Sequence, residues 1–481
     1  MKGTNMTRPF ASLPNKLYLS FLAFIIALLS QVTPAGATPP DLNGGVNNEY
    51  TYEEYVFLRG TPERFSGKVT KTESEQTDKK TTTYRFTLTG PTAKDKLTRS
   101  VSYVTDVKER LDKGQTTTQT TVKSYSEKIT FDKKTFTLDD YQLSHGVISD
   151  NRPASDYYSG NMVGRKIYKT DNDTITVHFS GRNVGYENFW GATETQIIDY
   201  EMVSSQGTAL ITSKVSDSKT KTMKYEPHDP SLSSFTGGHA VISQRNMIGE
   251  YTYDIPYAAG TGTVNVGQEM VPKIERLIVP KFRDLAKHWA KEDIEKLYSL
   301  GIFDEKSSFF SPNTPMNRYK FTVGVLKAAD VRVLEPPKNT RAPRKPVYAD
   351  LDVKDPDYLY IESAVQKGIT KGVTATKFMP KGSLTRAQAV TILIRALGLE
   401  HRAPTPGYKT SYADNSRIPN WAKDSVYVGT EIGLIYGDTK GRFNPNQTMT
   451  RAEASLLIIR YLNFLEKDLQ QNYRDDMLFF E

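Results

Sequence analysis

A single unit occurs three times in the C-terminal part of this 481-residue chain, at residues 281–333, 347–400 and 411–465. In every copy a Phe-x-Pro triplet is followed, six residues after its proline, by an arginine. The triplets begin at Phe310, Phe378 and Phe443, and the arginines are Arg318, Arg386 and Arg451. This regular spacing restricts the fold more than any other feature, because each copy must adopt the same supersecondary structure.

The pattern within each copy predicts two helices joined by a loop. In the first copy the apolar residues at helical spacing end at Gly301, where a helix end favours a left-handed residue. The second helix of the third copy begins with a capping box, formed by Thr450 and Glu453, and Thr385 and Gln388 repeat this arrangement in the second copy. We therefore expect an all-α module of three repeats.

The three copies resemble S-layer homology (SLH) domains, whose hallmark is the motif Thr-Arg-Ala-Glu. Residues 450–453 match the motif fully, residues 385–388 match it with one change, and residues 317–320 match it only at the arginine. The resemblance implies a pseudo-threefold helical assembly that docks exported proteins non-covalently onto anionic secondary cell-wall polysaccharide, often bearing pyruvylated amino sugars. It also implies a location in the cell wall or at the cell surface, and self-association in a surface layer.

The repeated arginine suggests how such a polymer is held. An arginine in the first turn of a helix is unfavourable next to the helix dipole, yet each copy has one there. A helix start offers free amides, and a guanidinium beside them can form paired hydrogen bonds with a carboxylate. We therefore expect Arg386 and Arg451 to bind an acidic sugar; an arginine that is merely solvated is the alternative.

The resemblance adds further candidate ligand-binding residues around these arginines. They are Asp350, Asp414, Gly372, Gly437 and Trp421, followed by Asp284, Trp289 and Arg318 in the first copy. The aspartates have an alternative role as helix caps or turn residues, and the two tryptophans have one as core residues. Glu305 stands where the other copies have Gly372 and Gly437, so a structural role alone is the alternative for the groove of the first copy.

Residues 38–257 have a different composition, dense in Thr, Ser, Tyr and Lys. Segments such as 82–88 alternate strictly between polar and apolar residues, with turn residues between them, which predicts an antiparallel β-sandwich or meander. Residues 258–280 are rich in Gly and Pro and are interpreted as a linker, and residues 466–481 as a C-terminal tail.

The first 37 residues predict a secretory signal peptide. Three basic residues precede an apolar run from Leu17 to Leu29, and small residues end at Ala37, where we expect cleavage. The run is too short to span a membrane, so we expect no membrane span after cleavage.

Residues 281–481 carry a net charge of +7 and residues 38–280 a net charge of −2. Because the chain is predicted to be exported, this indicates an anionic wall polymer rather than nucleic acid.

The chain contains no cysteine, which excludes thiol catalysis, disulfides and iron–sulfur clusters. The six histidines show no metal-binding spacing, so we predict no metal, no cofactor and no catalytic residue. We therefore favour a structural or interaction role for the β-rich region. The alternative is a wall-tethered polysaccharide-acting enzyme with its active site in that region. Residues 186–190 are aromatic and predict either a sugar-stacking surface or core packing.

Overall fold

The computed structural model describes residues 40–76, 78–110, 114–132, 134–225, 238–331, 333, 345–405 and 407–468. The predicted signal peptide and most of the predicted C-terminal tail lie outside these residues. None of the helices in the described ranges is both long enough and apolar enough to cross a membrane.

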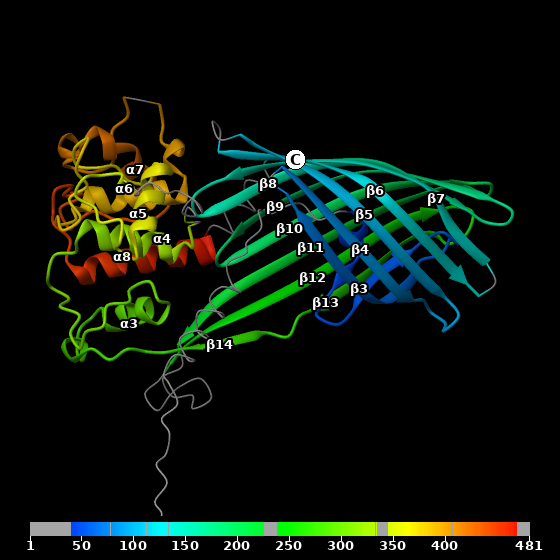
Figure 1. The fold of residues 1–481 in the computed structure, drawn as a ribbon, viewed down its shortest axis with the longest axis horizontal. Coiled ribbons are helices and arrows are strands. Elements are labelled where there is room, and N and C mark those ends of the chain that lie inside the picture. The colour runs from blue at the N-terminus through cyan, green and yellow to red at the C-terminus, as the bar shows by residue number, and fades with distance from the viewer. Residues whose placement is uncertain are drawn as a thin grey trace, which may run out of the picture. The chain divides into compact units, whose positions relative to one another are not determined.

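One antiparallel sheet contains every strand of the structure's described part (Figure 1). Strands β1 to β13 follow one another in sequence order, each paired with the next, and β14 pairs with β12. The strands are β1 (Val46–Asn47), β2 (Tyr52–Val56), β3 (Glu63–Glu75), β4 (Lys79–Thr89), β5 (Lys96–Arg110), β6 (Gln115–Phe131), β7 (Lys134–Asn151), β8 (Ser155–Lys169), β9 (Thr174–Asn188), β10 (Gly191–Ser204), β11 (Gly207–Tyr225), β12 (His239–Ile255), β13 (Gly260–Glu269) and β14 (Lys273–Leu277). The prediction of an antiparallel all-β region is confirmed, and it takes the form of a meander rather than a two-sheet sandwich.

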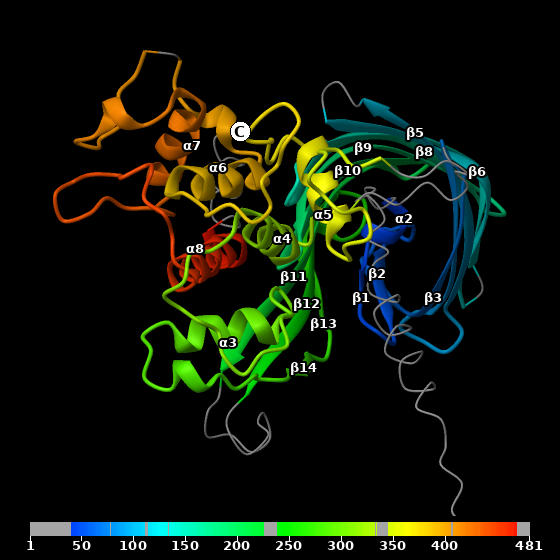
Figure 2. The same ribbon diagram turned by 60° about the vertical axis from the view of Figure 1, so that its left-hand side comes forward.

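The sheet curls into a nearly closed barrel (Figure 2). Most of its strands have one apolar face, and these faces line the inside of the curled sheet. In β5, for example, Leu97, Arg99, Val101 and Tyr103 are buried inside, whereas Thr98, Ser100 and Ser102 between them are partly or fully exposed. Strand β1 approaches β12 and β13, and the side chain of Asn48, just after β1, donates a hydrogen bond of 2.7 Å to that of Gln268 in β13. In the part of the chain that the structure describes, a single curled sheet therefore encloses its own core without a second sheet to cover it.

The interpretation of residues 258–280 as a linker does not agree with the structure. Strand β13 pairs with β12 over ten residues, and β14 pairs with another part of β12. Val264 and Val266 alternate with polar residues and pack against the interior of the sheet. The linker prediction relied on the glycine content of this segment, whereas the alternation of its apolar and polar residues is typical of a strand.

The C-terminal part is helical, as predicted, with two main helices in each repeat. These helices are α3 (Lys291–Ser299) and α4 (Arg318–Ala328), α5 (Tyr358–Gln366) and α6 (Arg386–Leu397), and α7 (Asn420–Glu431) and α8 (Arg451–Asn463). The first helix of each repeat packs against the second helix of the preceding repeat. The pairs are α5 with α4, α7 with α6, and α3 with α8, so the packing order closes on itself.

Three backbone hydrogen bonds at the centre of the helical module show the same cyclic order. The amide of Met316 donates to the carbonyl of Met449 (2.9 Å), that of Met449 to Leu384 (3.0 Å), and that of Leu384 to Met316 (2.8 Å). Each of these residues lies just before the second helix of its repeat. The three repeats therefore form a ring in which every copy contacts both others.

The helical module and the sheet share an apolar contact at residues 186–190. Trp190 is only 3% exposed and belongs to the same apolar cluster as α4, α6 and α8. The side chain of Asn188 donates a hydrogen bond of 3.2 Å to the carbonyl of Leu465. Of the two roles predicted for this aromatic segment, core packing is the one that the structure shows for Trp190.

Candidate functional site: three composite grooves

The second helix of each repeat begins with the repeated arginine, and the residue before it caps the helix. The predicted capping boxes are present at Thr385 with Gln388 and at Thr450 with Glu453. In the first repeat Asn317 accepts a hydrogen bond of 2.7 Å from the amide of Lys320, without the reciprocal bond. The capping residues therefore account for their own positions in the motif without a ligand.

Each arginine extends away from its own repeat and lies over the phenylalanine of the next repeat's Phe-x-Pro turn. The guanidinium carbon of Arg318 is 4.7 Å from the ring centroid of Phe378, that of Arg386 is 5.2 Å from Phe443, and that of Arg451 is 4.4 Å from Phe310. Every candidate groove is thus built from two repeats. Cation–π contact positions the guanidinium but leaves its N–H groups to find other partners.

The free amides that we expected at the helix starts are not free. The amide of Arg386 donates to the carbonyl of Gln447, that of Ala387 to Pro445, and that of Gln388 to the hydroxyl of Thr385. The first three amides of α8 are bonded in the same way, two of them to carbonyls of the first repeat. Any anion in these grooves must therefore be held by side chains rather than by the helix terminus.

The side chains of the predicted aspartates hold turns, and neither Asp284 nor Asp414 caps the short 3-10 helix at which it stands. Asp414 accepts hydrogen bonds from the amides of Phe443 (2.7 Å) and Asn444 (2.8 Å), and Asp284 and Asp350 hold the equivalent turns. The residue after each phenylalanine has a positive φ, which is 56° at Asn444. Burial acts to raise the pKa of Asp350, but its two amide hydrogen bonds outweigh this and lower that pKa. The turn role proposed as the alternative is what the structure shows for all three.

Among the described residues, the guanidinium of Arg386 has the fewest hydrogen-bond partners of the three arginines. One N–H of its guanidinium donates a 2.6 Å hydrogen bond to the carbonyl of Tyr436, and its Nε is buried without a hydrogen-bond partner. Within the described ranges no carboxylate forms an ion pair with it. Burial lowers the pKa of Arg386, although the nearby Tyr412 acts against this. A cation in such a setting is short of hydrogen-bond acceptors.

The groove of Arg318 is filled by the protein itself. This side chain is only 7% exposed, and its guanidinium donates to the hydroxyl of Thr370 (2.9 Å) and to the carbonyls of Phe378 (3.3 Å) and Lys371. Burial lowers its pKa as well. Arg318 therefore joins the first and second repeats and has little room for a ligand.

The groove of Arg451 contains an acidic side chain. Arg451 donates a hydrogen bond of 2.6 Å to Oε2 of Glu305, and Lys320 forms an ion pair with the same carboxylate. The hydroxyl of Tyr298 donates a further bond of 2.8 Å to Glu305. Arg451, predicted like Arg386 to bind an acidic sugar, thus already has a carboxylate partner within the protein.

The glycines equivalent to Glu305 are explained by a neighbouring tyrosine ring. A Cβ added to Gly372 would lie 2.4 Å from the ring of Tyr348, and one added to Gly437 would lie 3.1 Å from the ring of Tyr412. In the first repeat Phe282 replaces the tyrosine. Two copies thus combine a tyrosine with a glycine, and the first copy combines Phe282 with Glu305. The sequence contains these combinations, but only the fold shows that the two positions are in contact.

The two tryptophans are exposed rather than part of the core, by 63% at Trp289 and 50% at Trp421. The carbonyl of Trp421 accepts a 3.4 Å hydrogen bond from Arg395, which lies nine residues after Arg386 on α6. That is about 13 Å along the helix axis. The structure therefore places Trp421 near the far end of α6 from Arg386, and does not bring the two predicted ligand-binding residues into one contact.

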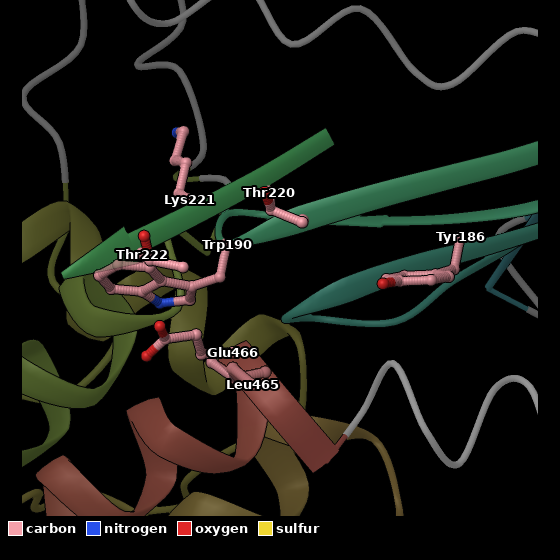
Figure 3. Close-up of a pocket in the computed structure, with 8 residues that line it drawn as sticks. Tyr186, Trp190, Thr220, Lys221, Thr222, Leu465 and Glu466 are labelled. Atoms are coloured by element: carbon pink, nitrogen blue, oxygen red, sulfur yellow. The ribbon is translucent and has the colours of Figure 1, made fainter. Parts of the chain in front are cut away.

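A pocket of about 280 Å³ lies where the sheet meets the end of the helical module (Figure 3). Its lining includes Trp190 and Lys221 from the sheet and Leu465 and Glu466 from the module. Among the described residues that line it, Glu466 is the one acidic residue, and Figure 3 shows its carboxylate beside the indole of Trp190. The described lining therefore does not include the pair of carboxyl groups that most glycoside hydrolases use.

The interior of the sheet contains a group of charged residues, but their contacts are structural. Arg99 donates two hydrogen bonds of 2.9 Å to Glu54 and two of 3.0 Å to Glu127, and Lys166 donates one of 2.5 Å to Asp41. Burial acts to raise the pKa of Asp41 and of Glu127, but the positive charges of Arg99 and Lys166 outweigh it and lower both. These two carboxyl groups are therefore ionised and unsuited to act as general acids.

Comparison with known proteins identifies the repeats. The S-layer homology domain model matches residues 281–318, 347–390 and 411–455. An endoglucanase of Bacillus sp. (strain KSM-635) is 31% identical over 144 residues, which are 28% of this chain and 15% of the endoglucanase. An exoglucanase, XynX, of Acetivibrio thermocellus is 30% identical over 37% of this chain and 16% of its own length. A surface-layer 125 kDa protein of Lysinibacillus sphaericus is 27% identical over 42% of this chain and 16% of its own length. The chain thus spans less than a fifth of these curated relatives.

Proposed function

We propose that this secreted protein, which carries three S-layer homology domains and is attached to the cell wall, is held there by an acidic polysaccharide that binds in the groove of Arg386. The polymer expected from the family resemblance is a secondary cell-wall polysaccharide with carboxylate groups on pyruvylated amino sugars. In this proposal the helical module is the anchor and the curled sheet is the part displayed at the surface.

The observation that carries the proposal is that the guanidinium of Arg386, unlike that of Arg451, has no carboxylate partner among the described residues, and that Arg386 is less buried than Arg318. Its guanidinium lies over Phe443 and donates to one carbonyl, and its Nε, like those of Arg318 and Arg451, is buried without a partner. A carboxylate from a sugar would supply the missing acceptors in the paired geometry that guanidinium groups favour. The lack of free helix amides makes this side chain the main source of affinity for the acid group.

Binding of the full chain to purified wall sacculi, before and after removal of their secondary polymer, tests the proposal. We expect retention only on the intact sacculi. Arg386→Ala should weaken retention about 10- to 100-fold, the equivalent of one lost charge-assisted contact. Arg417→Ala is the matched control, because Arg417 is an exposed arginine of the third repeat, and it should bind like the unaltered protein. Equal retention on stripped and intact sacculi would contradict the proposal.

A wall-tethered polysaccharide-acting enzyme is the second candidate. It is favoured by the presence of an endoglucanase and an exoglucanase among the relatives, although the matched segments are a small part of those proteins. Incubation of the full chain with cellulose, xylan and purified wall glycan, followed by measurement of reducing ends, decides this question. Release of reducing ends that survives Arg386→Ala would assign an activity to the sheet region.

Assembly into a surface layer is a further expectation, because several relatives are S-layer proteins. Electron microscopy of the purified full chain, with and without wall polymer, distinguishes a lattice from dispersed particles.

A further inference from the structure

We propose that Glu305 acts as an internal substitute for the ligand carboxylate and keeps the groove of Arg451 closed. The inference rests on the proposed function of Arg386, and it concerns how many of the three grooves accept a ligand. In this view the module has one open groove, one groove filled by Arg318, and one groove that its own acidic residue blocks.

The geometry of Glu305 is that of a bound anion. Its Oε2 lies 2.6 Å from one terminal nitrogen of Arg451, and its Oε1 lies 3.4 Å from the other, so that both carboxylate oxygens face the guanidinium. Tyr298 and Lys320 also contact the carboxylate. These contacts are what an acidic sugar would have to replace.

Comparison with the Arg386 groove shows what a single substitution changes. Glu305 and Gly437 both occupy the position four residues after the helix-ending glycines, which are Gly301 and Gly433. At Gly437 no side chain projects, and Arg386 bonds only to the backbone of this loop. The two grooves therefore differ in whether this position carries a carboxylate, and also at the residues equivalent to Lys320 and Phe282, which are Glu453 and Tyr412 in the Arg386 groove.

A carboxylate tethered in the groove competes with an external one at a high effective concentration. The external ligand must first displace the Glu305–Arg451 hydrogen bonds, which weakens its apparent affinity by about 10- to 100-fold. The closed groove thus lowers the number of attachment points. Arg451 and its helix are the same as Arg386 and its helix in this respect, and only Glu305 closes the groove.

Isothermal titration calorimetry of the full chain with the methyl glycoside of an N-acetylated amino sugar that carries a pyruvyl ketal tests the inference. We expect one binding site per chain for the unaltered protein and two for Glu305→Gly. The double variant Glu305→Gly, Arg451→Ala should return to one site, and Arg451→Ala alone should leave the stoichiometry at one. Glu305→Ala serves as a second opening variant, and thermal melting monitors whether each variant is folded.

The outcomes separate the two proposals. No binding by the unaltered protein would contradict the function assigned to Arg386. One site in the unaltered protein and still one in folded Glu305→Gly and Glu305→Ala would overturn the inference about Glu305 alone. Two sites in the unaltered protein, reduced to one by Arg451→Ala, would overturn it as well, because the Arg451 groove would then be open without any substitution.

Discussion

The turn aspartates offer a direct measure of what stabilises each repeat, because every one of them bonds to a turn of its own repeat. Asp414 is 8% exposed, and its carboxylate accepts the amides of Phe443 and Asn444. These bonds fix a turn that contains a non-glycine residue with φ of 56°. Asp414→Ala removes both acceptors and leaves the two amides without partners in a largely buried place.

The size of the effect follows from these contacts. An amide left unsatisfied in a buried site costs about 1–3 kcal/mol, so the loss of two bonds should lower the free energy of unfolding by about 2–5 kcal/mol. For a cooperative unit of about 150–250 residues, each kcal/mol shifts the melting temperature by about 2–4 °C. We therefore expect Asp414→Ala to melt about 5–15 °C below the unaltered protein. Asp414→Asn keeps one acceptor oxygen, so its melting temperature should lie between those of Asp414→Ala and the unaltered protein.

Circular dichroism at 222 nm, recorded during heating of the full chain, follows the helices of the module. Asp352→Ala is the matched control: Asp352 is exposed and accepts one amide hydrogen bond, from Lys354, in a surface turn. It should change the melting temperature by no more than about 2 °C. If Asp414→Ala and Asp352→Ala melted at the same temperature, the turn bonds would not be a source of stability and the reasoning would fail.

Three further predictions concern the sheet and the grooves. Arg99→Met should destabilise the sheet by about 3–5 kcal/mol in denaturant unfolding, because it leaves buried carboxylates without their main partner. The folded-state pKa values of Asp41 and Glu127 are lowered. Their ionised carboxylates therefore stabilise the fold above the unfolded-state pKa values, which are near 4, and this contribution is lost as the pH falls further. Unfolding of the sheet, followed by intrinsic fluorescence, should thus be acid-sensitive below about pH 4. Gly372→Ala should lower the melting temperature of the module, because its Cβ would lie 2.4 Å from the ring of Tyr348.

Each of these predictions has a control in the same chain. Arg85→Met changes an exposed arginine on β4 and should leave the unfolding free energy within about 0.5 kcal/mol of the unaltered protein. Gly267→Ala places a Cβ with its nearest atom 3.7 Å away and should not lower stability. Acid-induced unfolding that was unchanged in Arg99→Met would show that the interior charges do not govern the pH response.

The parts of the fold that depend on local spacing could be predicted from the sequence. Both capping boxes, the helix-ending Gly301 with φ of 69°, and the antiparallel alternation of the sheet are where the sequence places them. Each depends on residues a few positions apart, so a single chain contains the whole signal. The closure of the sheet was not predictable in this way, because whether a meander curls on itself or divides into two layers depends on twist summed over many strands.

The state of each groove was beyond sequence reasoning for a related reason. Arg318, Arg386 and Arg451 occupy the same position in their repeats and looked alike, yet their partners come from the following repeat and differ. Glu305 was noticed only as a missing glycine. That its carboxylate reaches Arg451, 146 positions away, depends on the ring closing between the third and first repeats.

This closure has a consequence for how the module works as a unit. Because each arginine lies over the phenylalanine of the next repeat, no repeat contains a complete groove, and the central hydrogen bonds of Met316, Leu384 and Met449 require all three copies. A substitution in the first repeat therefore acts on the arginine of the third. Two repeats alone would leave one arginine and one turn without partners, so three is the smallest number that the observed ring of contacts allows. We therefore expect wall attachment to require the closed ring of three repeats. Within this ring, a change in one loop, such as that of Glu305, can open or close a groove without altering the helix that supplies the arginine.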